Sequence, residues 1–158
     1  MKKTILICAL LSIVFVECKK TEDTAATTST TTTPTTTSST FTLANFGTFT
    51  VPSGSFGVAT GNTTQLQFVF GGTKGSVNGG GNIYFPLGAA SGTYMVTTTK
   101  TGLAANQVYL DMESGPAYAV EVAQSGTVAL TITGTKYKIA YSNLPDAGTD
   151  KLSASLSN

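Results

Sequence analysis

From Phe41 onward, apolar and polar residues alternate with the period of two that is typical of β-strands. Five segments show this alternation clearly, and we expect the apolar stripe of each to face a core. The stripes are Leu66, Phe68 and Phe70; Val108, Leu110 and Met112; Tyr118, Val120 and Val122; Val128, Leu130 and Ile132; and Tyr137, Ile139 and Tyr141. The intervening residues, among them Asp111, Glu113 and Glu121, are expected to face solvent.

The clearest predicted hairpin joins 127–133 to 135–141 through a tight turn at Gly134. Clusters of Gly, Pro, Asn and Ser punctuate the rest of the chain and separate other short segments. The glycine-rich run 71–81 is interpreted as a long flexible hairpin connection. Further strands are predicted near 46–51, 55–60, 82–86, 93–99 and 151–157.

These segments predict an all-β domain over residues 41–158, because no stretch shows helical periodicity over three turns. About eight or nine short strands at this spacing are typical of an antiparallel sandwich, with a small β-barrel as the alternative. The 118 residues of this segment are enough to bury one ordinary core.

The first residues of the chain break this pattern. Lys2 and Lys3 precede a 12-residue apolar run at 5–16. That run is too short for a stable membrane-spanning helix, which takes about 20 apolar residues. A basic start, a short apolar stretch and then polar residues are typical of an export signal. We therefore expect residues 1–17 to be a signal peptide and the chain to be exported.

Cys18 lies at the end of the apolar run, where bacterial lipoproteins carry the cysteine that is acylated and becomes the mature N-terminus. The segment 13–18, IVFVEC, resembles such a lipobox in position, although Glu17 stands where a small residue is usual. Cys8 lies in the leader, so after cleavage Cys18 has no disulfide partner. The resemblance implies lipid attachment at Cys18; a simple secretory signal, cut after Cys18 or near Ala26, is the alternative.

The residues after the cysteine extend this resemblance. The segment 18–23, CKKTED, looks like the start of mature lipoproteins of Bacteroidetes, in which Lys followed by acids is associated with display at the cell surface. The tripeptide DTA at 23–25 looks like an O-glycan acceptor of that phylum, with Thr24 as the acceptor. Within 82–158, the GTY and GTVALT strands resemble a run common in its short lipoproteins, which are mostly of unknown function. The resemblance implies a lipid-anchored outer-membrane protein at the cell surface, with a periplasmic or secreted protein as the alternative.

Residues 18–40 are expected to form the lipid-anchored N-terminus and a disordered stalk. Residues 21–40 contain 12 Thr, three Ser and one Pro, and they offer almost nothing apolar to bury. Burial therefore cannot offset the entropy lost on ordering this segment. We expect it to lift the β domain off the membrane.

Charge and residue types narrow the possible functions. Residues 41–158 carry five Lys and five acidic residues, so the domain is formally neutral. Nucleic-acid binding depends on clustered cations, and none are clustered here, so we expect no nucleic-acid partner. The chain has no His, the usual general acid–base residue, and no catalytic or cofactor motif. We therefore expect a protein that is not an enzyme and needs no cofactor.

Three carboxylates are the candidates for a metal site. Asp111 and Glu113 are two residues apart on a predicted strand, so they share a face at about 7 Å. Glu121, on the next predicted strand, is expected to lie across from them. Such a cluster would suit Ca²⁺ or a glycosidase pair, whereas a solvated polar face is the ordinary interpretation.

The favoured hypothesis is a non-catalytic binding or structural module. Its expected partners are the membrane, through the lipid anchor, and glycans or envelope proteins. Tyr84 and Tyr109 are expected to be exposed and to make such contacts. The alternatives are an envelope glycan hydrolase that uses Asp111, Glu113 or Glu121, and an architectural coat subunit.

Overall fold

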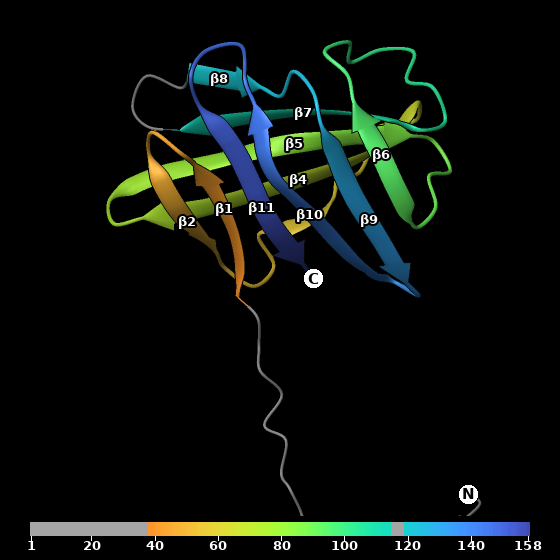
Figure 1. Ribbon diagram of the computed structural model, residues 1–158. Coiled ribbons are helices and arrows are strands. Elements are labelled where there is room, and N and C mark those ends of the chain that lie inside the picture. Colours follow the sequence, from red (N-terminus) through yellow and green to blue (C-terminus); the bar gives the residue numbers. More distant parts are fainter. Residues whose placement is uncertain (1–37, 115–118) are drawn as a thin grey trace, which may run out of the picture. The chain divides into compact units, whose positions relative to one another are not determined.

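The computed structural model describes residues 38–114 and 119–158 (Figure 1). That part of the chain has 11 strands and no helix, and so contains no helix able to cross a membrane. The predicted signal peptide, Cys18, Thr24 and the predicted stalk up to residue 37 lie outside it. The strands are β1 (Ser39–Leu43), β2 (Gly47–Val51), β3 (Phe56–Val58), β4 (Gln65–Lys74), β5 (Val77–Pro86), β6 (Gly92–Val96), β7 (Gln107–Ser114), β8 (Ala119–Val122), β9 (Thr127–Thr133), β10 (Lys136–Pro145) and β11 (Lys151–Ser157).

The strands form one mixed sheet in the order β2-β1-β11-β10-β9-β6-β7-β5-β4-β3, and β8 pairs with β7. In Figure 1, β2, β1, β11, β10, β9 and β6 make a front layer, and β7, β5 and β4 cross behind it. The layers join where β6 pairs with β7 and where Thr50 of β2 pairs with Thr73 of β4. The predicted all-β class is confirmed, and two packed layers are consistent with a sandwich-like fold.

Side chains from both layers meet in one core. The apolar stripes predicted in β4, β7, β9 and β10 all face it, and Val108, Leu110 and Met112 are fully buried. Phe68 of β4 packs edge-on against Tyr137 of β10, with 5.0 Å between the ring centroids. The period-two alternation therefore located the residues that hold the two layers together.

The predicted hairpin at Gly134 is also confirmed. β9 and β10 pair from Lys136 with Thr133 to Ala140 with Ala129. Gly134 lies in the turn with φ of 60°, a left-handed conformation that glycine adopts without strain.

The glycine-rich run 71–81 is strand, and the expectation of a flexible connection is wrong. The β4–β5 ladder continues through it up to a tight turn. The rings of Phe41 and Phe49 stack with 4.7 Å between centroids, and a Cβ on Gly79 would lie 3.1 Å from both rings. Glycine therefore provides the space that lets these rings pack on the strand backbone.

The first strand begins two residues before the predicted domain boundary at Phe41. The Ser39 hydroxyl donates to the Ser157 carbonyl at 3.0 Å and accepts from the Ser157 amide at 2.8 Å. The start of the described chain is thus tied to the last strand, at the lower end of Figure 1.

One pairing departs from the predicted antiparallel arrangement. β6 and β7 are parallel, with Met95 opposite Gln107 and Val96 opposite Val108. A tight turn reverses the chain and so joins antiparallel strands. Parallel neighbours need a longer crossover connection, which returns the chain to the end where the first strand began. Residues 97–106 supply it, and we call them the crossover loop. This loop, which replaces the end of the strand predicted at 93–99, forms one wall of the site described next.

Candidate functional site

The back layer carries large polar and aromatic side chains on the surface that points away from the core. The strand register places Gln67, Tyr84 and Tyr109 in one row across β4, β5 and β7. Asn82 and Asp111 lie opposite each other in the next row. The crossover loop adds Lys100. We call this group the tyrosine face; its members are Gln67, Asn82, Tyr84, Lys100, Tyr109 and Asp111.

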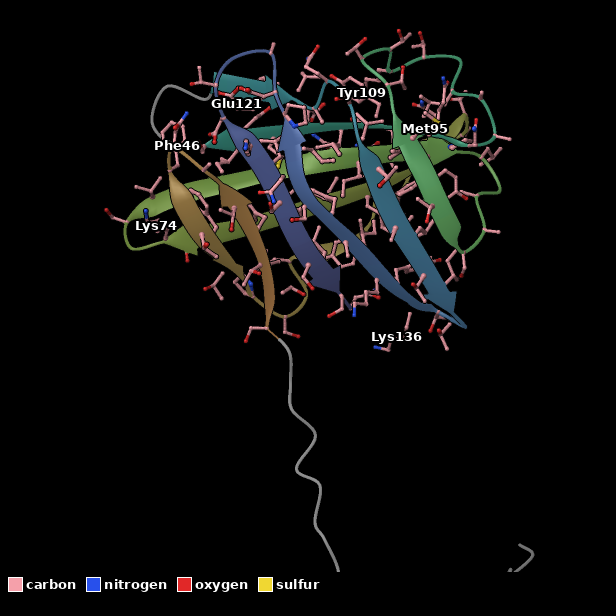
Figure 2. The ribbon with its side chains drawn as sticks, in the orientation of Figure 1. Phe46, Lys74, Met95, Tyr109, Glu121 and Lys136 are labelled. Atoms are coloured by element: carbon pink, nitrogen blue, oxygen red, sulfur yellow. The ribbon has the colours of Figure 1, made fainter. Side chains whose placement is uncertain are left out.

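Two tyrosine rings form the centre of the tyrosine face. The rings of Tyr84 and Tyr109 lie 5.9 Å apart between centroids and are tilted by 54°. The Lys100 ammonium lies 4.1 Å from the centroid of the Tyr84 ring, a cation–π geometry. Tyr84 is consequently only 5% exposed, so the expectation that it is an exposed aromatic is wrong. Tyr109 is half-buried and lies at the upper end of the molecule in Figure 2.

A chain of hydrogen bonds orients the polar groups beside these rings. Gln67 Nε2 donates to Asn82 Oδ1 at 3.1 Å and to the Tyr84 hydroxyl at 3.2 Å. Asn82 Nδ2 donates to Asp111 Oδ1 at 2.8 Å. Asp111 is buried, so this charge-assisted bond matters to the fold as well as to the surface. The amides and the carboxylate are held in place before any ligand arrives.

Two hydrogen bonds with glutamine side chains hold the crossover loop, one on β4 and one on β7, the two outer strands of the tyrosine row. Gln65 Nε2 donates to the Lys100 carbonyl, and the Ala104 amide donates to Gln107 Oε1 at 3.0 Å. Because Gln65 is two residues from Gln67 along β4, this anchor lies one row further along the same surface. The backbone of the loop is therefore held, while the Lys100 side chain extends beyond it.

A hollow of about 650 Å³ lies next to the tyrosine row. Its walls are Gln65, Pro86 and Leu87 on one side and, on the other, four residues of the crossover loop: Thr101, Gly102, Leu103 and Ala105. Its volume falls within the range of about 300–1,000 Å³ that small-ligand sites usually occupy. The hollow adjoins the tyrosine row, because Gln65 and Pro86 are paired in the row next to Gln67 and Tyr84.

The electrostatics of the tyrosine face follow from its neighbours. The pKa of Lys100 is raised, chiefly by its interaction with the Tyr84 hydroxyl and further by the charge of Asp111, against a smaller lowering by burial. The pKa of Tyr109 is raised by burial and then by the negative charge of Asp111. At neutral pH, Lys100 is therefore a cation and Tyr109 a neutral phenol that can donate a hydrogen bond.

Only two of the three predicted carboxylates share a surface. Asp111 and Glu113 both point away from the core, as predicted, but the expectation that Asp111 faces solvent is wrong, because that residue is buried beside β5. Glu121 lies opposite Met112 in the β7–β8 ladder, so its side chain is on the other side of the sheet. The expectation that it lies across from Asp111 is wrong, since a register shift of one residue changes the face. For the same reason Val120, predicted to face the core, is 55% exposed.

Glu121 instead lies near two carboxylates of the β10–β11 loop. Its pKa is raised, first by the carboxyl of Asp146, then by burial and by the charges of Asp146 and Asp150. Asp146 Oδ1 accepts hydrogen bonds from the amides of Gly148 and Asp150, at 3.0 and 2.9 Å. Such bonds between an Asp side chain and following backbone amides are typical of a turn. Within residues 38–114 and 119–158, no three acidic or cysteine side chains are placed to hold a metal ion.

Some members of the tyrosine face that were not predicted had a partial signal in the hydrophobic pattern. Gln67 lies between two apolar residues of a predicted strand, and Asn82 precedes Ile83 in another, so the outward direction of both follows from the alternation. Their meeting with Asp111 depends on which strands are neighbours, and period-two patterns carry no such information. Lys100 lies in a loop, where no alternation indicates the direction of its side chain.

No family model, no curated protein and no solved structure matches this chain. The site is therefore interpreted from its own geometry.

Proposed function

We propose that this chain is an exported protein, held at the outer membrane by a lipid on Cys18, whose β domain binds glycans without transforming them. The observation that carries the proposal is the tyrosine face, in which two tyrosine rings lie beside oriented amides, a carboxylate and a hollow. The apolar side of a sugar ring packs on an aromatic ring, and its hydroxyls exchange hydrogen bonds with amides and carboxylates.

The rigidity of the tyrosine face supports this proposal. Gln67, Asn82 and Asp111 are already linked to one another, so ordering them on binding costs little entropy. Tyr109 offers both a partly exposed ring and a phenol hydroxyl. The hydrolase alternative has less support, because Glu121 and the pair Asp111–Glu113 lie on opposite sides of the sheet.

The arrangement of the domain suits display from a tether. The described chain begins at the lower end of Figure 1, and Figure 2 shows Tyr109 at the upper end. Tyr109 thus lies at a different end of the domain from the point where the chain enters β1, so ligand binding there would not involve that point. In this proposal Thr24 is a glycosylated residue of the linking segment, and the membrane is the partner of the lipid.

The anchor is tested by the intact mass of the protein isolated from cells. We expect a mature N-terminus at Cys18 that carries diacylglyceryl and acyl groups, and a C18A variant that leaves the membrane fraction. A mature chain that starts at Lys19 or Thr27 would contradict the anchor.

Binding is tested by probing a glycan array with the full mature chain in detergent. We expect Y109A to weaken binding by about tenfold, since one aromatic contact is worth roughly 0.5–1.5 kcal/mol. F46A is the matched control, because Phe46 is an aromatic residue, 40% exposed, in the β1–β2 turn, and Figure 2 shows it on a different part of the molecule from Tyr109. Equal loss in both variants, or no binding by the parent chain, would argue against a glycan site.

A further inference from the structure

Lys100 is the one cation among the residues that define the tyrosine face. Its ammonium lies over the ring of Tyr84 and is attracted by the charge of Asp111. Glu113 lies on the same surface, one row beyond Asp111. Without the Lys100 side chain, this surface would hold two tyrosine rings and two carboxylates.

The position that Lys100 occupies has the chemistry of a cation site. A positive charge over a tyrosine ring is stabilised by the ring quadrupole, and a nearby carboxylate adds Coulomb attraction. The Asp111 carboxylate accepts one side-chain hydrogen bond from the described residues, through Oδ1 from Asn82, and this leaves capacity for another donor. The site thus already selects an ammonium group, supplied at present by the protein itself.

The Lys100 side chain can leave without disturbing the fold. It comes from the crossover loop, whose backbone is held separately by Gln65 and by the Ala104–Gln107 hydrogen bond. The residue is exposed, and its four-carbon stem is flexible. A neutral sugar that displaced it would leave Tyr84 and Asp111 without a cation, whereas a cationic sugar would restore both interactions.

We propose that the tyrosine face recognises an amino sugar through its ammonium group, and that Lys100 is a displaceable occupant of the same position. The inference rests on the proposed glycan-binding function and names the chemical class of the ligand. The sugar ring packs on Tyr109 and in the adjoining hollow, and the ammonium takes the place of Lys100 over Tyr84, next to Asp111.

The test compares two oligosaccharides that differ only at the C2 nitrogen: a β-1,4-linked glucosamine oligomer, with free amines, and its fully N-acetylated counterpart, with neutral amides. Calorimetry is run on the full mature chain in detergent, at a mildly acidic pH where the sugar amines are protonated. We expect the amine form to bind at least about tenfold more tightly, which is the scale of one desolvated cation–π contact with a carboxylate neighbour. Added salt should weaken the amine form more than the acetylated form.

Variants assign the preference to the named residues. K100M removes the occupant and should strengthen binding of the amine oligomer, by about threefold or more for a cation–π contact at an exposed site. D111N keeps an oxygen for Asn82 and removes the charge, so it should abolish most of the preference for the amine. K138M is the matched control on the front layer, where Lys138 is exposed, and should change neither affinity. Circular dichroism confirms that each variant is folded.

The possible failures are distinguishable. If the acetylated oligomer binds as tightly as the amine, the amino-sugar inference is overturned and glycan binding stands. If K100M weakens binding, Lys100 is part of the site and the displacement idea is overturned. If neither oligomer binds, and the array shows no other glycan, both proposals fail. Should D111N not fold, the salt dependence of the two oligomers in the parent chain decides the question.

Discussion

The outer surfaces of the two layers are built on the same alternation yet carry opposite kinds of side chain. On the front layer, the register lines up short hydroxyl residues across β2, β1 and β11, with Thr42 between Thr48 and Ser153. On the back layer, the corresponding outward positions of β5 and β7 hold Tyr84 and Tyr109. Both layers pack their inner side chains in the same core, so core packing does not explain why their outer side chains differ.

The two surfaces differ in which polar and charged groups are available to a ligand. The hydroxyls of Thr42 and Thr48 are 2.8 Å apart and satisfy each other locally. The front layer also has a hollow of about 490 Å³, beside a bulge where Asn143 has φ of 53°. Its lining contains no charged side chain, and the ring of its one aromatic residue, Tyr141, is buried. Of these two surfaces, the tyrosine face of the back layer has aromatic rings, amides, a cation and a carboxylate next to one another, whereas the lining of the front-layer hollow has no charged side chain. Binding is therefore proposed at the tyrosine face.

The largest expected effect is a loss of stability of the whole domain, on which both surfaces depend. F68A deletes a fully buried ring that packs against Phe56, Phe85 and, across the layers, Tyr137. We expect a loss of about 3–5 kcal/mol in the free energy of unfolding. Urea denaturation followed by circular dichroism measures it. L87A is the control, because Leu87 is 67% exposed and should cost about 0.5 kcal/mol or less.

The next effect is confined to the back layer. N82L removes the donor to Asp111 Oδ1 and leaves a buried carboxylate with one hydrogen bond fewer. We expect a loss of about 1–3 kcal/mol in unfolding free energy, together with weaker glycan binding. V69L is the control: it changes the residue directly opposite Asn82 on β4, and it should change neither the unfolding free energy nor glycan binding. Equal stabilities of N82L and the parent would show that the hydrogen-bond chain is not structural.

The front layer should tolerate the equivalent change. T42V keeps the shape of Thr42 and removes its hydroxyl bond to Thr48. Because both residues have solvent access, we expect about 0.5 kcal/mol or less in unfolding free energy and no change in binding. A double-mutant cycle with T48V measures the coupling of the pair. A coupling as large as the effect of N82L would mean that the two surfaces do not differ as proposed.

The smallest effect concerns pH and the end of the molecule where β8 meets the β10–β11 loop (Figure 2). The folded protein raises the pKa of Glu121, mainly through Asp146. Folding therefore favours the protonated form, so this contribution to stability is present at low pH and is lost as the pH rises through the raised pKa. E121Q, which stays neutral, should lose less stability over that rise. Solvent around Glu121 screens the effect, so it should be the smallest of the four.

Parallel denaturation series for E121Q and the parent across this pH range measure the difference in slope. A parent slope equal to that of E121Q would contradict the interaction between Glu121 and Asp146. D146N, which removes the largest cause of the raised pKa, should flatten the parent slope in the same way.

Local pattern predicted well where a strand faces a core on one side. Val108, Leu110 and Met112 are buried as the alternation required, and the hairpin at Gly134 lies where its turn residue placed it. The prediction failed at β8, because the register of a short edge strand is set by its neighbour. Glu121 therefore faces Asp146 and not Asp111, although its own flanking residues suggested the reverse.

Composition misled where glycine was taken for flexibility. A run such as Gly79–Gly81 is typical of loops, yet here it is strand, and the rings of Phe41 and Phe49 occupy the space that a side chain on Gly79 would need. Phe41 and Phe49 gave no local indication of this contact. The pairing of β1 with β2 stacks the two rings, and the tertiary fold places them against Gly79.

By itself, the sequence determined the all-β class, the position of most core residues and the outward direction of Gln67, Asn82, Tyr84 and Tyr109, because each follows from side chains alternating along one strand. The tertiary structure alone decided that these residues meet. Strand order, the parallel β6–β7 pair and the crossover loop that places Lys100 over Tyr84 are contacts between distant segments. Their energies depend on packing across the whole fold, which no local pattern records.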